Sequence, residues 1–251
     1  MLGYTRYMKE RRSTSIDRLQ QLRLGKTSKL KLLVWRTRRL LRDTIGKDAL
    51  AVEEHTTVRG ADIKRLYLKI NDFMLRFFPR LESDTPKDVA LEMLRDAISE
   101  LGYTIVENPV KPWGATFRMD SREAERFVHE FFPGLTMKEA QMGNPDLELS
   151  PKFMLLSPGV RISWQYHHNR AEKWRFLTDG AYITSETDEI GKVITGRAGD
   201  IVQFDAGIRH RGLANQDGRS YTLIAEIWQH TNPDELSTED DIVRVQDDYR
   251  R

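Results

Sequence analysis

Two histidines, a glutamate and a glutamine are spaced along the second half of the chain in a pattern that could bind a metal ion. Gln165 and His167 are two residues apart in a segment that reads as a β-strand, so their side chains point to the same face. Glu172 follows a predicted turn and can fold back toward them, and His210 lies in a later strand behind a glycine-bounded turn. Two imidazoles and two oxygen ligands suit a borderline divalent cation. We therefore expect one divalent metal ion, zinc first, with manganese, iron, cobalt and nickel as alternatives.

The bland alternative is that these side chains are hydrogen-bonded core groups of a protein without a metal. The neighbouring His168 points to the opposite face from His167 if the strand stays regular, which makes it a rim residue. Three of the six histidines of the chain lie inside this short pattern, in β context and with a Gln and a Glu at matching offsets. That concentration favours a metal site over a metal-free remnant of one.

The elements that must position these residues are short strands. From residue 152 onward, β-rich runs alternate with turns that contain Gly, Pro, Asn or Asp, which is typical of an antiparallel sandwich or small barrel. The predicted runs are 153–156, 160–166, 173–178, 181–186, 192–195, 200–204, 208–214 and 221–229. In the acidic tail at 238–248 we expect Ile242 and Val243 to pack on the barrel, with Arg244 near the pocket.

The first half of the chain is predicted to be helical. Apolar periodicity indicates helices at 29–43, 61–81 and 86–101, and a further helix at 121–132 is inserted after a short strand at 103–106. The expected fold class is α+β, with a helical region at 1–102, whose first 50 residues are basic and flexible, and a β-barrel domain at 103–251.

Composition excludes several classes of site. The 251 residues include no cysteine, so a disulfide scaffold, a Cys-ligated zinc or iron–sulfur site and a thiol nucleophile are ruled out. No run of 18 apolar residues indicates a membrane span, and the charged first 30 residues do not resemble a secretory leader. The expectation is a cytoplasmic protein without a membrane partner.

Charge is distributed unevenly along the chain. Residues 1–50 hold 14 Lys or Arg against 4 Asp or Glu, whereas the remainder holds 26 against 34. A basic segment of this kind can bind nucleic acid or an anionic membrane surface, or it can be a solvated arm. Because it has neither interleaved aromatic residues nor a DNA-binding signature, we favour the arm and expect no nucleic-acid partner.

The glycine-to-ligand spacing resembles the two motifs of the cupin family. In the first, Gly159 precedes Gln165 by five intervening residues, followed by His167, Glu172 and Gly180 at near-family spacing. The positions of the second motif are occupied by Gly199, Asp205, Gly207, His210 and Asn215. Gln stands at the first His position, Asp stands at the Pro position, and one residue is inserted before the Asn. The resemblance implies a cupin-type jelly-roll barrel.

A narrower resemblance is to the type II mannose-6-phosphate isomerases. Three strings carry it in the family's order: Lys-Pro-Trp-Gly at 111–114, His-His-Asn-Arg-Ala-Glu-Lys-Trp at 167–174, and Glu-Asp-Asp-Ile-Val-Arg at 239–244. It covers about residues 109–251 and none of the first hundred. The chain lacks the nucleotidyltransferase domain of the larger family members, so guanylyl transfer is not implied. Carried over residue by residue, the resemblance implies that the metal ligands are Gln165, His167, Glu172 and His210.

The resemblance implies aldose–ketose isomerisation of a sugar phosphate through a cis-enediol, with a homodimer as the expected assembly. The bases open to the reaction are Lys152, His168 and Glu226. Arg170 either acts with them on the substrate or forms a structural ion pair, and Arg211 is assigned to the phosphate. Lys173, at a position where the family has His, is assigned with Glu226 to substrate binding. The alternatives are a non-catalytic sugar-binding cupin that acts as a sensor or scaffold, and another cupin metalloenzyme such as a dioxygenase.

Overall fold

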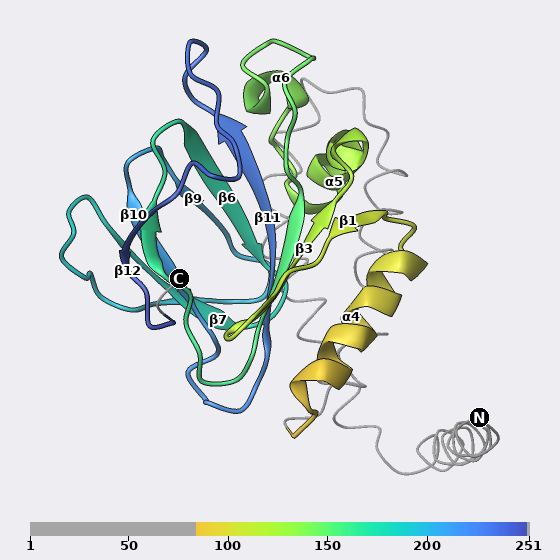
Figure 1. Ribbon diagram of the computed structural model, residues 1–251, viewed down its shortest axis with the longest axis vertical. Helices are drawn as coiled ribbons and strands as arrows, with labels where there is room; N and C mark the ends of the chain where they lie inside the picture. Colours follow the sequence, from red (N-terminus) through yellow and green to blue (C-terminus); the bar gives the residue numbers. More distant parts are fainter. Residues whose placement is uncertain (1–83, 250–251) are drawn as a thin grey trace, which may run out of the picture. The chain divides into compact units, whose positions relative to one another are not determined.

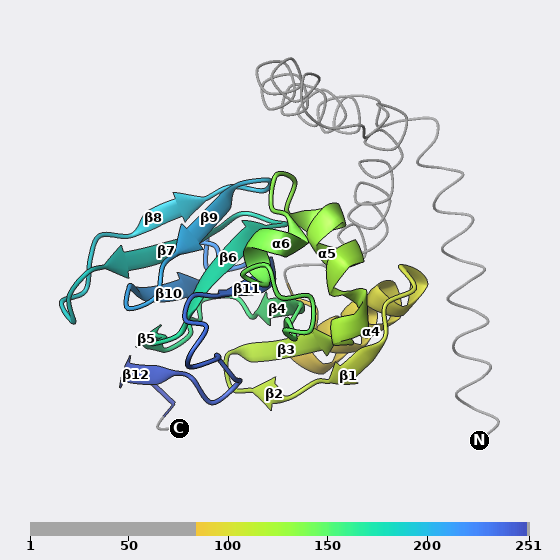
Figure 2. The ribbon, with the colours of Figure 1, turned by 90° about the horizontal axis from the view of Figure 1, so that it is seen from above.

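Eight strands between residues 152 and 230 form two antiparallel sheets. The computed structural model describes residues 84–249. In one sheet the order is β4-β11-β6-β9, and in the other it is β5-β10-β7-β8 (Figure 1 and Figure 2). The bounds are β4 Lys152–Leu156, β5 Trp164–Tyr166, β6 Arg170–Phe176, β7 Gly180–Ser185, β8 Ile194–Gly196, β9 Ile201–Phe204, β10 Arg209–Leu213 and β11 Thr222–His230. This interleaved order is that of a jelly roll, so the predicted cupin-type antiparallel barrel is confirmed.

Each sheet is extended at one edge by further strands, and the predicted short strand at 103–106 overlaps the first of them. The first sheet continues from β4 to β3 (Gly114–Met119) and on to β1 (Ile105–Glu107), and β2 (Val110–Lys111) pairs with β3. In the second sheet, β12 (Val243–Gln246) from the acidic tail pairs with β5. The segment from 105 to 119 and the acidic tail therefore complete the sheets to seven and five strands.

Alternation along β11 separates two cores. Leu223, Ala225 and Ile227 face the helices, and the intervening residues Ile224 and Glu226 face the space between the sheets. All five are buried. A strand that is covered on both faces has a nearly continuous run of apolar residues. Glu226 is the exception in β11, and it shows that the interior is polar at that point.

The outer face of the seven-stranded sheet is covered by helices. Helix α4 (Lys87–Glu100), the 3-10 helix η2 (Ser121–Glu123), α5 (Ala124–Phe131) and α6 (Met137–Ala140) all lie on this side (Figure 2). At the centre of the layer, the Phe153 ring of β4 makes edge contacts with Phe127 and Phe131 of α5, with both centroid separations at 5.1 Å. The predicted helices at 86–101 and 121–132 correspond to α4 and to η2 with α5. Because α4 shares this core, it belongs physically with the sheet.

The interior between the sheets is apolar at one end and polar at the other. At the apolar end, Trp174 and Phe176 of β6 pack with Phe204, Ile224 and other buried side chains. The Pro-Trp-Gly string also belongs there, because Trp113 is buried in the same cluster. Gly114 has a φ of +148°, and a Cβ at that position would overlap the carbonyl oxygen of Leu155, so glycine is required.

Part of the sequence prediction lies outside the described residues. The helices expected at 29–43 and 61–81, and the basic segment at 1–50, belong to this part. The described residues all lie in one compact unit. Among residues 84–249, no helix has both the length and the hydropathy that a bilayer span requires.

Candidate metal centre

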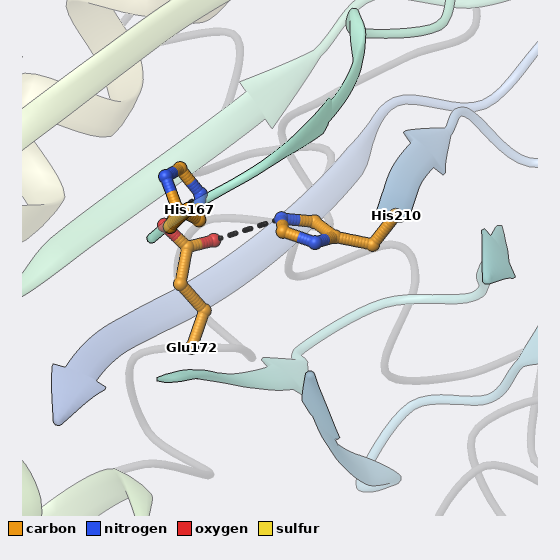
Figure 3. A group of neighbouring side chains, drawn as sticks. All are labelled: His167, Glu172 and His210. Carbon is orange, nitrogen blue, oxygen red and sulfur yellow. Dashed lines mark ion pairs between the residues drawn. The ribbon is translucent and has the colours of Figure 1, made fainter. Parts of the chain in front are cut away.

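Three buried side chains converge at the polar end of the barrel interior: His167, Glu172 and His210 (Figure 3). Their candidate ligand atoms all lie within 4.8 Å of one another. The Nε2 atom of His167 is 2.9 Å from Oε1 of Glu172, and Nε2 of His210 is 3.3 Å from Oε2. None of the three side chains is more than 2% exposed. The structure therefore brings together three of the four residues that the sequence analysis selected as ligands.

Strand register explains why residues so far apart in sequence meet here. His210 of β10 is the direct antiparallel partner of Gln165 of β5, so both belong to the interior face of the five-stranded sheet. His167 is two residues beyond Gln165 and keeps that face. Glu172 comes from β6 in the opposite sheet, where its register partner on β11 is Trp228. Two ligands from one sheet and one from the other close the group across the barrel.

Backbone carbonyls determine the protonation of the two imidazoles. Nδ1 of His167 lies 2.5 Å from the carbonyl oxygen of Asp241, and Nδ1 of His210 lies 3.0 Å from that of Ile208. A carbonyl can only accept, so each Nδ1 carries the hydrogen and each Nε2 presents a lone pair. Both Nε2 atoms are buried without a hydrogen-bond partner. Two lone pairs and a carboxylate aimed at one another form a donor set that fits a divalent cation.

Charge and burial keep the ligands in their metal-binding forms. Burial lowers the pKa of His167, which favours the neutral imidazole. Burial alone raises the pKa of Glu172, but interactions with His167 and with the Arg170 guanidinium hold it well below its usual range. Nε and Nη2 of Arg170 lie 3.1 Å and 3.0 Å from Oε1 of Glu172. The indole Nε1 of Trp174 donates to Oε2 at 3.2 Å. Glu172 is therefore an oriented carboxylate.

The ring of His210 is also held by aromatic neighbours. Phe204 of β9 stacks on it at 4.5 Å between centroids and 12° between planes, and Trp174 meets it edge-on at 5.3 Å. Together with the Ile208 carbonyl, these contacts restrict both ring position and rotation. A ligand held in this way loses little rotational freedom on binding a metal, which favours affinity.

Gln165, the fourth residue that the family resemblance makes a ligand, lies on the same interior face. It is buried, and its Oε1 accepts a hydrogen bond from Oγ of Ser163 at 2.5 Å. The amide is thus partnered within its own strand segment. Its role as a ligand stays a prediction.

A second group of charges lies at the same end of the interior. Lys152 of β4 is the register partner of Glu226 of β11, with Nζ 3.3 Å from Oε1. Its Nζ also lies 2.8 Å from Oε2 of Glu239, whose Oε1 accepts from Ser150 at 2.5 Å. Burial, together with the Glu172 carboxylate, raises the pKa of Glu226 to about 7 despite the opposing effect of Lys152. The interior therefore holds a carboxyl group that titrates near neutrality.

Trp228 of β11 packs beneath two of the interior cations. The Arg170 guanidinium lies 4.5 Å from the Trp228 ring centroid, and Nζ of Lys152 lies 4.8 Å from it. Nη1 of Arg170 donates to the carbonyl of Thr238 at 2.7 Å. Both cations are thus fixed in the interior, as their assignment to the site requires.

Three other residues that were assigned to the site point elsewhere, and strand alternation is the reason. His168 follows His167 directly and is exposed, with its ring edge-on to Tyr166. Lys173 follows Glu172 and pairs with the helix-facing Ile227, so it lies on the outer face of its sheet. Arg211 follows His210 and is fully buried on the outer side, where Nη2 donates to the Gln246 carbonyl at 3.3 Å. The structure brings none of them to the metal centre.

Two residues of the tail approach the site that sequence reasoning did not select. Glu239 reaches Lys152, and Asp241 accepts from His167 through its main-chain oxygen. The available signal was the acidic string at 239–241, which reads equally well as a solvated end. The structure places these two residues through the contacts of Glu239 and Asp241 and the pairing of β12 with β5.

Comparisons with known proteins give only distant likenesses. No family model matches the chain, and no curated protein matches it. Among solved structures, a cupin 2 conserved barrel protein from Salinispora arenicola is 22% identical over 32% of this chain and 62% of its own, with a TM-score of 0.28. Oxalate decarboxylase from Bacillus subtilis is 14% identical over 55% of this chain and 29% of its own, with a TM-score of 0.37.

A third structure, CapF with a tropolone inhibitor, is 14% identical over 82% of this chain and 57% of its own, with a TM-score of 0.38. The chain thus spans less than two thirds of each of these three proteins. The barrel fold of this chain is established by its own strand order.

Proposed function

We propose that this protein is a metal-dependent aldose–ketose isomerase that acts on a sugar phosphate. The observation that carries the proposal is a pairing of groups: a buried His-Glu-His donor set lies at the same end of one barrel as Glu226, a carboxyl whose pKa is raised to about 7. Isomerisation needs both a cation to stabilise an enediolate and a base that works near neutral pH.

A divalent ion held by His167, Glu172 and His210 would supply Lewis-acid stabilisation of the substrate oxygens. The base of the proposal is Glu226. It takes the proton from C2 of the aldose and returns it to C1, while a second proton passes from the C2 hydroxyl to the oxygen on C1. The intermediate is a cis-enediol, and no atoms are gained or lost overall.

Position favours Glu226 among the three bases that the sequence left open. His168 is exposed outside the barrel. The Nζ atom of Lys152 is already paired with the carboxyl groups of Glu226 and Glu239. Glu226 is buried and has a pKa matched to the reaction. Lys152 then serves to hold the Glu226 carboxylate and to attract the substrate's negative charge.

Lys152 and Arg170 are the cations assigned to the phosphate of the substrate. Both lie in the interior above Trp228, although each already contacts a carboxylate. Arg211 no longer has this role, because its guanidinium is on the outer side of its sheet. The proposed partner is still an anionic sugar phosphate, but the residues proposed to bind its phosphate are now Lys152 and Arg170.

The test is a metal analysis combined with conversion of mannose 6-phosphate to fructose 6-phosphate. The proposal expects turnover by the metal-loaded protein, loss of metal in His210→Ala, and loss of turnover with retained metal in Glu226→Gln. Lys173→Ala, on the outer face, is the matched control and keeps both. Bound metal without turnover of any phosphosugar would favour the sugar-binding alternative, and oxygen uptake with an organic acid would favour a dioxygenase.

A further inference from the structure

We infer that Asp241 is a positioning residue that fixes the metal ligand His167 from the C-terminal segment. This inference rests on the metal centre of the proposed function and on none of its isomerase chemistry. It concerns two groups of Asp241. The main-chain carbonyl accepts a hydrogen bond from the ring of His167, and the side-chain carboxylate accepts hydrogen bonds from the turn that follows this ligand.

The turn at 167–169 has backbone groups that the strands leave without partners. Strand β5 ends at Tyr166 and β6 begins at Arg170, so the N–H groups of His168 and Asn169 fall between the two ladders. The Asp241 carboxylate accepts both, from His168 N at 2.8 Å and from Asn169 N at 3.0 Å. Successive N–H groups that face one carboxylate form an anion-binding nest.

The same residue holds the ring of the ligand. Nδ1 of His167 lies 2.5 Å from the Asp241 carbonyl oxygen, which directs Nε2 toward Glu172. The two segments are therefore joined by two sets of hydrogen bonds. The side chain of Asp241 accepts from the turn, and the His167 ring donates to the main chain of Asp241. A hydrogen bond to the second nitrogen of a ligating histidine fixes its tautomer and raises its basicity.

The segment that carries Asp241 is itself anchored. Oγ of Ser237 donates to Oδ2 of Asp241 at 2.9 Å, and the Asp241 amide donates to the carbonyl of Thr238 at 3.1 Å. That carbonyl also accepts from Arg170, which contacts Glu172. The short tail segment therefore reaches two of the three ligands, His167 directly and Glu172 through Arg170.

A residue that merely fastens the tail would make the same contacts, so the test must read out the metal. Asp241→Ala removes the carboxylate, and Asp241→Asn keeps one oxygen to accept while placing an NH₂ against an N–H. Asp240→Ala is the matched control, because it removes one negative charge from an exposed neighbouring side chain. Metal-free unfolding of each variant measures the purely structural contribution.

The measurements are the dissociation constants of Zn²⁺ and Co²⁺, by competition with a chromophoric chelator, and the visible absorption of the Co²⁺ complex. We expect Asp241→Ala to weaken binding about 10–100-fold and to change the Co²⁺ spectrum. Asp241→Asn should fall between it and the wild type, and Asp240→Ala should match the wild type in both readouts.

Wild-type affinity and spectrum in a folded Asp241→Ala protein would overturn the inference. If that variant does not fold, wild-type values in Asp241→Asn overturn it in the same way. A wild-type protein that takes up no metal would overturn the metal centre together with this inference. Failure of the isomerase assay alone, with metal bound, would overturn only the proposed reaction.

Discussion

Glu226 of β11 faces Lys152 of β4 inside the barrel, with the lysine Nζ 3.3 Å from the Glu226 Oε1. Both side chains are less than 10% exposed, at 6% and 8%. Yet the pKa of Glu226 is raised to about 7, because burial and the Glu172 carboxylate together outweigh the attraction of the lysine. The Glu226 carboxyl therefore gains and loses its proton near neutral pH.

Replacing Glu226 with glutamine should abolish proton transfer and leave the metal in place. General acid–base groups contribute about 10²–10⁴-fold to rate, so kcat should fall by that range. Burial raises the pKa of Glu226, and the base must lose its proton, so activity of the wild type should rise with pH as this carboxyl titrates. Steady-state kinetics from pH 5.5 to 8.5, with metal content measured in parallel, check both. A glutamine variant with wild-type kcat would remove Glu226 from the mechanism.

Glu226 should also leave a signature in the stability of the metal-free protein. Its pKa rises from 4.5 to about 7 on folding, so the folded state binds its proton more tightly than the unfolded state. The stabilisation is complete below about pH 4.5 and is lost as pH rises to about 7. The difference in unfolding free energy between wild type and Glu226→Gln should therefore change in favour of the variant over this window. Chemical denaturation at pH 5 and pH 7.5 measures it, and parallel pH profiles would contradict the assignment.

The jelly roll could be read from the sequence because its signals are local. Turn residues such as Asp179–Gly180 and Asp217–Gly218 separate the strands, and each of the eight predicted runs contains or overlaps an observed strand. The unpredicted strands β3 and β12 have no such signal. Their strand character comes from pairing with β4 and β5, which are distant contacts that no short window contains.

The convergence of His167, Glu172 and His210 could be predicted from local motifs, whereas the positions of several neighbouring residues could not. His167 and Glu172 lie in one motif, and His210 has its own glycine-bounded turn. In a strand, the residue next to a ligand points to the opposite face. The assignment of Lys173 and Arg211 to the substrate site did not take this alternation into account. Asp241, by contrast, lies 74 residues beyond His167, and the register between a tail and a barrel mouth depends on tertiary packing alone.

Glu172 should matter for the fold as well as for the metal, because it partners the buried Arg170. Glu172→Gln should destabilise the metal-free protein by about 3–5 kcal/mol, the usual effect of leaving one charge of a buried pair alone. Combining it with Arg170→Met removes that orphan charge and should restore most of the loss, while metal binding stays absent in both variants. Denaturant unfolding and metal titration test this. A double variant less stable than Glu172→Gln alone would show that the pair is not the cause.

Glu239 should compete with the substrate for Lys152. Its carboxylate lies 2.8 Å from the lysine Nζ, and its side chain is 44% exposed, so it can be displaced from the mouth of the barrel. A half-exposed ion pair is worth up to about 1 kcal/mol. Glu239→Gln should therefore lower KM for a phosphosugar by up to about fivefold with little change in kcat, and should tighten the binding of inorganic phosphate measured by calorimetry.

Asp240→Asn removes a charge from the neighbouring exposed residue and is the control for a general electrostatic effect. Because salt screens exposed ion pairs, the difference in KM between Glu239→Gln and the wild type should become smaller at high ionic strength. The control should differ from the wild type only slightly at every salt concentration. An unchanged or higher KM in Glu239→Gln, with phosphate binding no tighter, would mean that Lys152 does not meet the anionic group of the substrate. The phosphate would then have to be held by Arg170, the other cation above Trp228.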